Sequence, residues 1–121
     1  MPALKITTRC HDNGLVLVLD GEIDMATEDQ FHQAVREAVE SRPRGRVVLD
    51  CTGLAFIDSS GLRVLIQAHK LAKERGSVVF IAAPSTRVAQ VLHVTAIDTR
   101  IPTFPTVDAA LVAPESSPSA S

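Results

Sequence analysis

The sequence predicts an α/β domain built around one mixed β-sheet, and two observations lead to this fold class. Short apolar runs typical of buried strands alternate along the chain with segments of helical periodicity. The first two strand patterns are separated only by a turn, whereas each later strand follows a helix. Because a turn gives an antiparallel pair and a helix gives a parallel crossover, most strands should be parallel. The predicted order is strand, strand, helix, strand, helix, strand, helix, strand, helix.

The chain begins with a hairpin pattern. Apolar and polar residues alternate over residues 4–10, which is typical of a half-buried strand. The dipeptide Asn13-Gly14 follows, and both residues tolerate the positive φ angles of a tight hairpin turn. Residues 15–19 then form an uninterrupted apolar run, which predicts a second strand antiparallel to the first.

A helix should follow the hairpin, ending before Pro43 and Gly45. Thr27 and Gln30 have the spacing of a capping box at its start. Its apolar positions recur at i, i+3, i+4, i+7 and i+8, the pattern of one buried helix face. These positions are Phe31, Ala34, Val35, Ala38 and Val39.

The third strand and the second helix come next. Residues 46–51 are short, β-branched and apolar, as expected for a buried strand. Helical periodicity runs from about Ser60 to Arg75, with Gly76 placed as a C-cap. Its polar positions form one solvent-facing stripe, which consists of Arg63, Gln67, Lys70 and Glu74.

The remaining elements are shorter. Residues 78–81 predict a fourth strand, and Ser85 should open a short helix after it. A last strand is expected near Ile101, followed by a helix capped by Thr106. Residues 113–121 are polar and lack apolar anchors, so we expect a disordered tail.

Composition limits the classes of function. With 121 residues, the chain is long enough for one domain, which we assign to residues 1–112. Aromatic residues make up 3% and the net charge is −2, which argues against base stacking and against a nucleic-acid partner. The sequence has no apolar run of about 20 residues and no signal-peptide pattern, which predicts a cytoplasmic protein with no membrane partner.

The cysteines and histidines do not predict a metal or cofactor site. Cys10 and Cys51 are too far apart for a metal knuckle and too few for a disulfide framework. Each falls at the end of a predicted strand, so we expect buried free thiols. The four histidines show no paired ligand spacing, and the glycines form no phosphate-binding loop.

The turn at residues 58–61, Asp-Ser-Ser-Gly, joins the third strand to the second helix. A serine at such a turn is well placed to cap the helix. The positive end of a helix also tolerates a phosphate, and Gly61 lacks side-chain bulk where another molecule could approach. The turn could therefore be a cap, a phosphorylation site, or both.

A second acidic turn should lie close to this serine turn. The second strand leads into Gly21-Glu22-Ile23-Asp24, and the carboxyl ends of parallel strands share one sheet edge. Asp24, Asp58 and Ser59 should therefore converge. A hydroxyl beside two carboxylates and without a positioned histidine does not suit a nucleophilic enzyme, so we expect no catalytic residue. A partner kinase that brings its own ATP and metal could use such a serine.

Two segments resemble a known family. Asp58-Ser59-Ser60-Gly61-Leu62, preceded by Phe56-Ile57 and by residues 47–50, resembles the phosphorylation motif of bacterial anti-sigma factor antagonists. These are small, single-domain members of the STAS family. Residues 19–24 resemble the family's Gly-Glu-(Leu/Ile)-Asp segment. The similarity extends from about Leu4 to Leu111.

The resemblance implies a STAS-like sheet and a switch at Ser59. In the family, an anti-sigma factor that is also an ATP-dependent serine kinase phosphorylates this serine, and a metal-dependent phosphatase reverses the reaction. The unphosphorylated antagonist binds the kinase and frees a sigma factor. The phosphosite environment implied here is Asp24, Asp58, Ser60 and Gly61. The convergence of the strand ends and the solvent-facing stripe of the helix predict the partner-binding residues, which are Gly21, Glu22, Asp24, Arg63 and Gln67. Many relatives have a small residue at the position of Arg63, which affects the choice of partner.

Two other functions remain open. In the first, the chain is a constitutive STAS subunit of a larger assembly, such as a stressosome or a lipid-transport complex, and Ser59 only caps a helix. In the second, it is a small hydrolase that uses Ser59. Phosphorylation of Ser59 by an ATP-loaded partner kinase would separate the switch from both.

Overall fold

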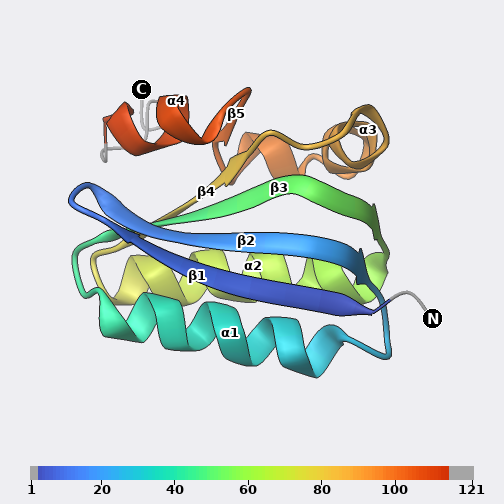
Figure 1. The fold of residues 1–121 in the computed structure, drawn as a ribbon, viewed down its shortest axis with the longest axis horizontal. Helices are drawn as coiled ribbons and strands as arrows, with labels where there is room; N and C mark the ends of the chain where they lie inside the picture. The colour runs from blue at the N-terminus through green and yellow to red at the C-terminus, as the bar shows by residue number, and fades with distance from the viewer. Residues whose placement is uncertain (1–2, 115–121) are drawn as a thin grey trace.

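The computed structural model describes residues 3–114, which form a five-stranded sheet with helices on both faces (Figure 1). The strands are β1 (Leu4–His11), β2 (Gly14–Ile23), β3 (Arg46–Ile57), β4 (Val78–Ala82) and β5 (Thr103–Phe104). The helices are α1 (Glu28–Ser41), α2 (Ser59–Glu74), α3 (Thr86–Val94) and α4 (Val107–Val112), with a short 3-10 helix, η1 (Ile97–Thr99). The α/β fold class and the predicted element order are confirmed.

The strands lie in the order of the sequence, β1-β2-β3-β4-β5. β1 and β2 are antiparallel, with His11 opposite Gly14, so the predicted hairpin is confirmed. All other neighbouring strands are parallel, because a helix connects each of them to the next. This topology puts the carboxyl ends of β2 and β3 side by side.

The two faces of the sheet bury different sets of residues. α1 and α2 lie next to each other along one face, and α4 covers part of the opposite face (Figure 1). Leu49 of β3 belongs to the larger core, to which α1, α2 and α3 contribute, whereas its neighbour Val48 packs with α4. Alternation along the strands therefore separates a large aliphatic core from a smaller one that contains Phe80.

A buried arginine at the start of β3 fixes the C-terminal helix. The guanidinium of Arg46 donates through Nη1 to the carbonyl oxygen of Ala110 (2.6 Å) and through Nη2 to that of Ala113 (2.5 Å). It also lies over the ring of Phe80, 5.3 Å from the ring centroid. Carbonyl groups at the end of α4, which have no partner within a helix, are thereby satisfied.

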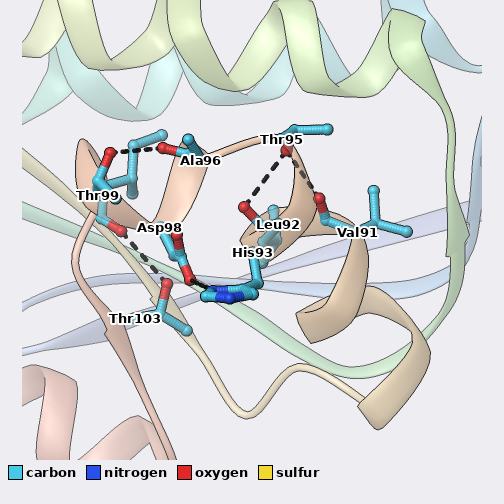
Figure 2. Close-up of polar contacts among 9 residues, drawn as sticks. Val91, Leu92, His93, Thr95, Ala96, Asp98, Thr99 and Thr103 are labelled. Atoms are coloured by element: carbon cyan, nitrogen blue, oxygen red, sulfur yellow. Dashed lines mark hydrogen bonds and ion pairs between the residues drawn. The ribbon is translucent and has the colours of Figure 1, made fainter.

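The segment between α3 and β5 is closed by local polar contacts (Figure 2). The hydroxyl of Thr95 donates to the carbonyl oxygen of Val91 over 2.7 Å, where α3 ends. Ala96 then adopts a left-handed conformation with φ of 62°. His93 Nδ1 lies 3.1 Å from a carboxylate oxygen of Asp98 across this turn. These contacts redirect the chain toward the edge of the sheet.

Some local predictions were wrong. Thr27 precedes α1 but makes no side-chain capping bond, and Gln30 Nε2 instead donates to the carbonyl oxygen of Leu4 over 2.8 Å. A long-range contact to the edge strand therefore replaces the predicted capping box. Cys10 is exposed because it lies on β1, at the edge of the sheet, and only Cys51 is buried as predicted.

The ends of three elements also differ from the predictions. β3 continues through Ile57, six residues beyond the predicted strand. The last strand is β5, whereas Ile101 is buried just before it. Of the predicted tail, residues 115–121 lie outside the described part of the chain, while Ala113 packs against the smaller core and bonds to Arg46. No helix within residues 3–114 has the length and apolar character needed to span a membrane.

Candidate phosphoserine turn and partner surface

The turns that follow β2 and β3 lie beside each other. Ile23 and Ile57 are the last register partners of the two strands. Beyond them, the backbone N–H of Asp58 donates to the carbonyl oxygen of Ile23 over 3.1 Å. This hydrogen bond places the turn that begins at Asp24 next to the start of α2, as expected from the parallel arrangement.

Asp58, and not a serine, caps α2. It has extended backbone angles, and its Oδ1 accepts hydrogen bonds from the backbone N–H groups of Ser60 (2.9 Å) and Gly61 (3.3 Å). Both serines already lie inside the helix, which begins at Ser59. The interpretation of the motif serine as the N-cap was therefore wrong, because the preceding carboxylate occupies that position and satisfies the free N–H groups.

The two serines have opposite environments. Ser59 is exposed, and its hydroxyl makes no hydrogen bond with any of residues 3–114. Ser60 is buried, with 4% of its surface exposed. An enzyme that approaches from solvent can therefore reach the hydroxyl of Ser59 without unfolding the helix, whereas Ser60 faces the core.

Gly61 has a packing role that differs from the one expected. A Cβ atom at this position would lie 2.6 Å from both Ile23 Cγ2 and Ile57 Cγ1, closer than real carbon contacts. Gly61 is buried, so its missing side chain allows α2 to pack tightly on the two strand ends. It does not open a path for another molecule, because the space that it leaves is filled by these isoleucines.

Asp24 is partly buried, and its carboxylate stabilises its own turn. Its Oδ1 accepts from the backbone N–H groups of Ala26 (2.9 Å) and Thr27 (3.2 Å). The hydroxyl of Thr27 in turn donates to the carbonyl oxygen of Glu22 over 3.0 Å. These bonds fix the turn beside the serine, so Asp24 both shapes the site and adds negative charge to it.

Gly21 allows a backbone conformation in β2 that other residues rarely adopt. It has φ of 119°, and a Cβ atom there would lie 1.8 Å from the carbonyl oxygen of Ala3. A register shift between β2 and β3 follows directly, between Gly21 and Glu22. Gly21 therefore allows the N-terminal segment to pass close to the end of β2, and Glu22 begins the shifted portion that leads to the acidic turn.

Arg63 and Gln67 both lie on the exposed side of α2. Arg63 Nη1 forms an ion pair with Glu28 Oε2 of α1 at 3.4 Å, and 62% of the arginine side chain is exposed. Gln67 lines a shallow groove of about 240 Å³ between α1 and α2, together with His32. The two predicted partner-binding residues of α2 are thus accessible and close in sequence to Ser59.

Sequence reasoning missed two apolar residues at this end of the sheet. Met25, directly after Asp24, is 80% exposed, and Phe56, the register partner of Glu22, is 38% exposed. Large exposed apolar residues on adjacent segments are typical of protein interfaces. The sequence could have indicated the exposure of Met25, since this residue lies outside any apolar helix or strand pattern.

The groups with shifted pKa values lie away from the serine turn. Burial raises the pKa of the Cys51 thiol to about 12, with a contribution from neighbouring Asp50. Partial burial lowers the pKa of His69, and the positive charges of Lys73 and Arg100 lower it further. Within residues 3–114, no three histidine, cysteine or carboxylate side chains are arranged to hold a metal ion.

Comparison with known proteins identifies a family for this arrangement. The STAS domain matches residues 5–110. An anti-sigma F factor antagonist of Paenibacillus polymyxa is 29% identical over 101 residues, which cover 84% of this chain and 86% of that protein. The anti-sigma-F factor antagonist RsfA of Mycobacterium tuberculosis is 29% identical over 112 residues, which cover 92% of this chain and 88% of that protein.

A solved structure agrees with these relatives. The crystal structure of an anti-sigma factor antagonist from Mycobacterium paratuberculosis superimposes with a TM-score of 0.75 and is 34% identical. The match covers 90% of this chain and 92% of that one. The family match spans nearly all of the described residues, including the five-stranded sheet and the serine turn. The chain therefore belongs to the STAS domain family, as its sequence resemblance to anti-sigma factor antagonists predicted.

Proposed function

We propose that this protein is an anti-sigma factor antagonist controlled by phosphorylation of Ser59. Its unphosphorylated form binds a cognate anti-sigma factor, which is also an ATP-dependent serine kinase, and thereby frees a sigma factor in the cytoplasm. The observation that carries the proposal is the exposed hydroxyl of Ser59 at the first position of α2, which makes no hydrogen bond within residues 3–114. The names of the relatives support the same role.

The geometry suits a phosphoacceptor better than a nucleophile. The backbone around Ser59 is held by the Asp58 cap and by the Asp58–Ile23 hydrogen bond, so the hydroxyl is presented at a fixed place. A kinase supplies the ATP, the metal ions and the base, and the substrate has only to present its hydroxyl in line with the phosphoryl group that is transferred. A metal-dependent serine phosphatase would reverse the reaction at the same exposed position.

The partner surface has an apolar part and a polar part. Met25 and Phe56 can bury apolar area against the kinase, and area of this kind carries much of the binding energy at protein interfaces. The polar part consists of the residues that the sequence predicted for partner binding, which are Gly21, Glu22, Asp24, Arg63 and Gln67. None of these five residues is fully buried, so the surface is available for binding.

Phosphorylation would release the partner through local charge. A phosphoserine carries about −1.5 to −2 charges at neutral pH, and at Ser59 it would lie beside the Asp58 carboxylate. The amino end of α2 offsets part of this charge inside the domain, by about 0.3–1 kcal/mol. A partner surface that fits a neutral hydroxyl offers no such offset, and a loss of about 3 kcal/mol lowers the affinity roughly a hundredfold.

The test is incubation with the cognate kinase and ATP, followed by mass spectrometry. One phosphate should appear on Ser59, and Ser59→Ala protein should gain none. Ser60→Ala is the matched control and should be phosphorylated normally, because Ser60 is buried. Phosphate on Ser60 alone would overturn the assignment. Stable binding without any phosphorylation would instead identify a constitutive STAS subunit.

A further inference from the structure

Arg63 lies four residues after Ser59 on the same helix, α2. Side chains at positions i and i+4 of an α-helix lie on the same face, with Cβ atoms about 5–6 Å apart. An acidic group that precedes a basic group in this spacing is the favourable orientation along the helix axis. The Arg63 guanidinium can therefore reach an anion attached to the Ser59 hydroxyl.

The present partner of Arg63 holds it only weakly. The ion pair to Glu28 Oε2 measures 3.4 Å, and the side chains are 62% and 26% exposed. Exposed pairs of this length contribute little to stability, because water and salt screen them. Glu28 offers a single charge, whereas a phosphate offers up to two charges and three acceptor oxygens, which match the guanidinium in a bidentate geometry.

We propose that phosphorylation of Ser59 draws Arg63 away from Glu28 and onto the phosphate, so that Arg63 is the phosphate-binding residue within the same chain. This inference rests on the proposed function, in which Ser59 is the phosphoacceptor. The ionisable residues of the two turns, and of the first turn of α1, are acidic, and they are Glu22, Asp24, Asp58, Glu28 and Asp29. A phosphate surrounded by these carboxylates gains most from the one neighbouring cation on its own helix face.

The exchange changes the partner surface in two ways at once. The surface gains an anion at Ser59, and it loses the extended positive side chain of Arg63, which turns toward the phosphate. Glu28 is left without its pair, which makes the α1 side of the surface more negative. A kinase that recognises the unphosphorylated surface therefore meets a rearranged set of charges, although the backbone keeps its position.

The experiment uses full-length protein with phosphoserine placed at position 59 during translation, so no kinase is required. The pKa of the phosphate is measured by phosphorus NMR titration. Arg63→Gln should raise this pKa by about half a unit, because the cation that stabilises the dianion is lost. In Arg63→Lys the phosphate pKa should lie between the other two values, since lysine keeps the positive charge but lacks the planar guanidinium that binds two oxygens at once.

The chain offers a matched control. Arg75 forms the equivalent ion pair at the other end of the same two helices, with Glu40, also at 3.4 Å. Arg75 lies 16 residues after Ser59, or about 24 Å along the helix, which is well beyond the screening length at physiological salt. Arg75→Gln should therefore leave the phosphate pKa unchanged.

Equal phosphate pKa values in the wild-type and Arg63→Gln proteins would overturn the inference. An equal rise in Arg63→Gln and Arg75→Gln would overturn it too, since the effect would then depend on net charge alone. The proposed function fails separately, when the cognate kinase leaves Ser59 unmodified. In that case the titration still reports whether Arg63 binds a phosphate placed there.

Discussion

The backbone N–H of Asp58 donates to the carbonyl oxygen of Ile23, and this 3.1 Å hydrogen bond joins the turns that follow β2 and β3. Asp58 also caps α2 through its side chain, so one residue connects the second strand, the third strand and the helix. The hydroxyl of Ser59 follows immediately and is therefore presented on a rigid support. Rigidity at this point favours a switch that acts through charge and leaves the backbone in place.

The charge switch predicts opposite behaviour for two substitutions of Ser59. Ser59→Asp should bind the kinase about a hundredfold more weakly, because it places a permanent negative charge on the surface. Ser59→Ala should bind well and should not be released by ATP. Calorimetric titration with and without ATP measures both effects. Equal affinities for the two variants would show that charge at this residue does not control binding.

The exposed apolar residues should contribute directly to partner binding. Met25→Ala should weaken kinase binding by about 1–2 kcal/mol, as expected for a residue that anchors an interface. Val94→Ala is the control, because Val94 is 75% exposed but lies at the end of α3. Both variants should melt within a few degrees of the wild-type protein. An equal effect of the two substitutions on affinity would remove Met25 from the interface.

Gly61→Ala should destabilise the domain although alanine favours helices. The added Cβ would lie 2.6 Å from Ile23 and from Ile57, and overpacking of this kind costs about 1–3 kcal/mol. Ser59→Ala adds no atoms to the core and provides the control in the same turn of the helix. Urea unfolding curves measure the difference. A stability of Gly61→Ala equal to or above that of the wild type would show that the isoleucines move aside without cost.

The Asp58 cap can be tested with a pair of substitutions. Asp58→Ala should lower the free energy of unfolding by about 1 kcal/mol, since the N–H groups of Ser60 and Gly61 lose their acceptor. Asp58→Asn keeps an acceptor oxygen and should retain most of the stability. Denaturant unfolding at neutral pH provides the measurement. Equal losses in both variants would indicate that the charge matters and the capping geometry does not.

The two cysteines should react at very different rates. Cys10 is exposed, whereas the buried Cys51 has a pKa raised to about 12 and therefore remains a neutral thiol at pH 8. A disulfide reagent should modify one thiol quickly in the native protein and two after unfolding. In Cys10→Ser protein the fast phase should disappear. A fast phase that persists in this variant would mean that the strand around Cys51 opens readily.

Local patterns in the sequence predicted the strands and helices because alternation and helical periodicity record which face of each element is buried. They also predicted which strand ends meet, since the helical connections make the later strands parallel. The contacts that refine the site depend on residues far apart in the sequence. Arg46 bonds to a carbonyl 64 positions away, and a glycine is needed at position 61 because α2 packs there against Ile23 of β2.

The cap of α2 shows a different limit of sequence reasoning. Aspartate and serine are both good N-cap residues, so composition alone did not decide whether Asp58 or a serine holds the helix. The answer depends on where the backbone leaves its extended conformation, and that point follows from the pairing of β3 with β2. β3 continues to Ile57, beyond the apolar run that marks its start, so Asp58 becomes the cap and the helix begins at Ser59.

The contact between Arg46 and the end of α4 has a practical consequence for tethering. Arg46 begins β3 and holds Ala113, while Ser59 lies just past the far end of this 12-residue strand. β3 alone spans about 36 Å, given the rise of an extended chain, so the two points lie at opposite ends of the sheet. A label, a surface or a second domain attached after residue 113 would therefore leave the molecule at the end remote from its serine. The chain could be anchored from that end and still offer the serine turn to a kinase in solution.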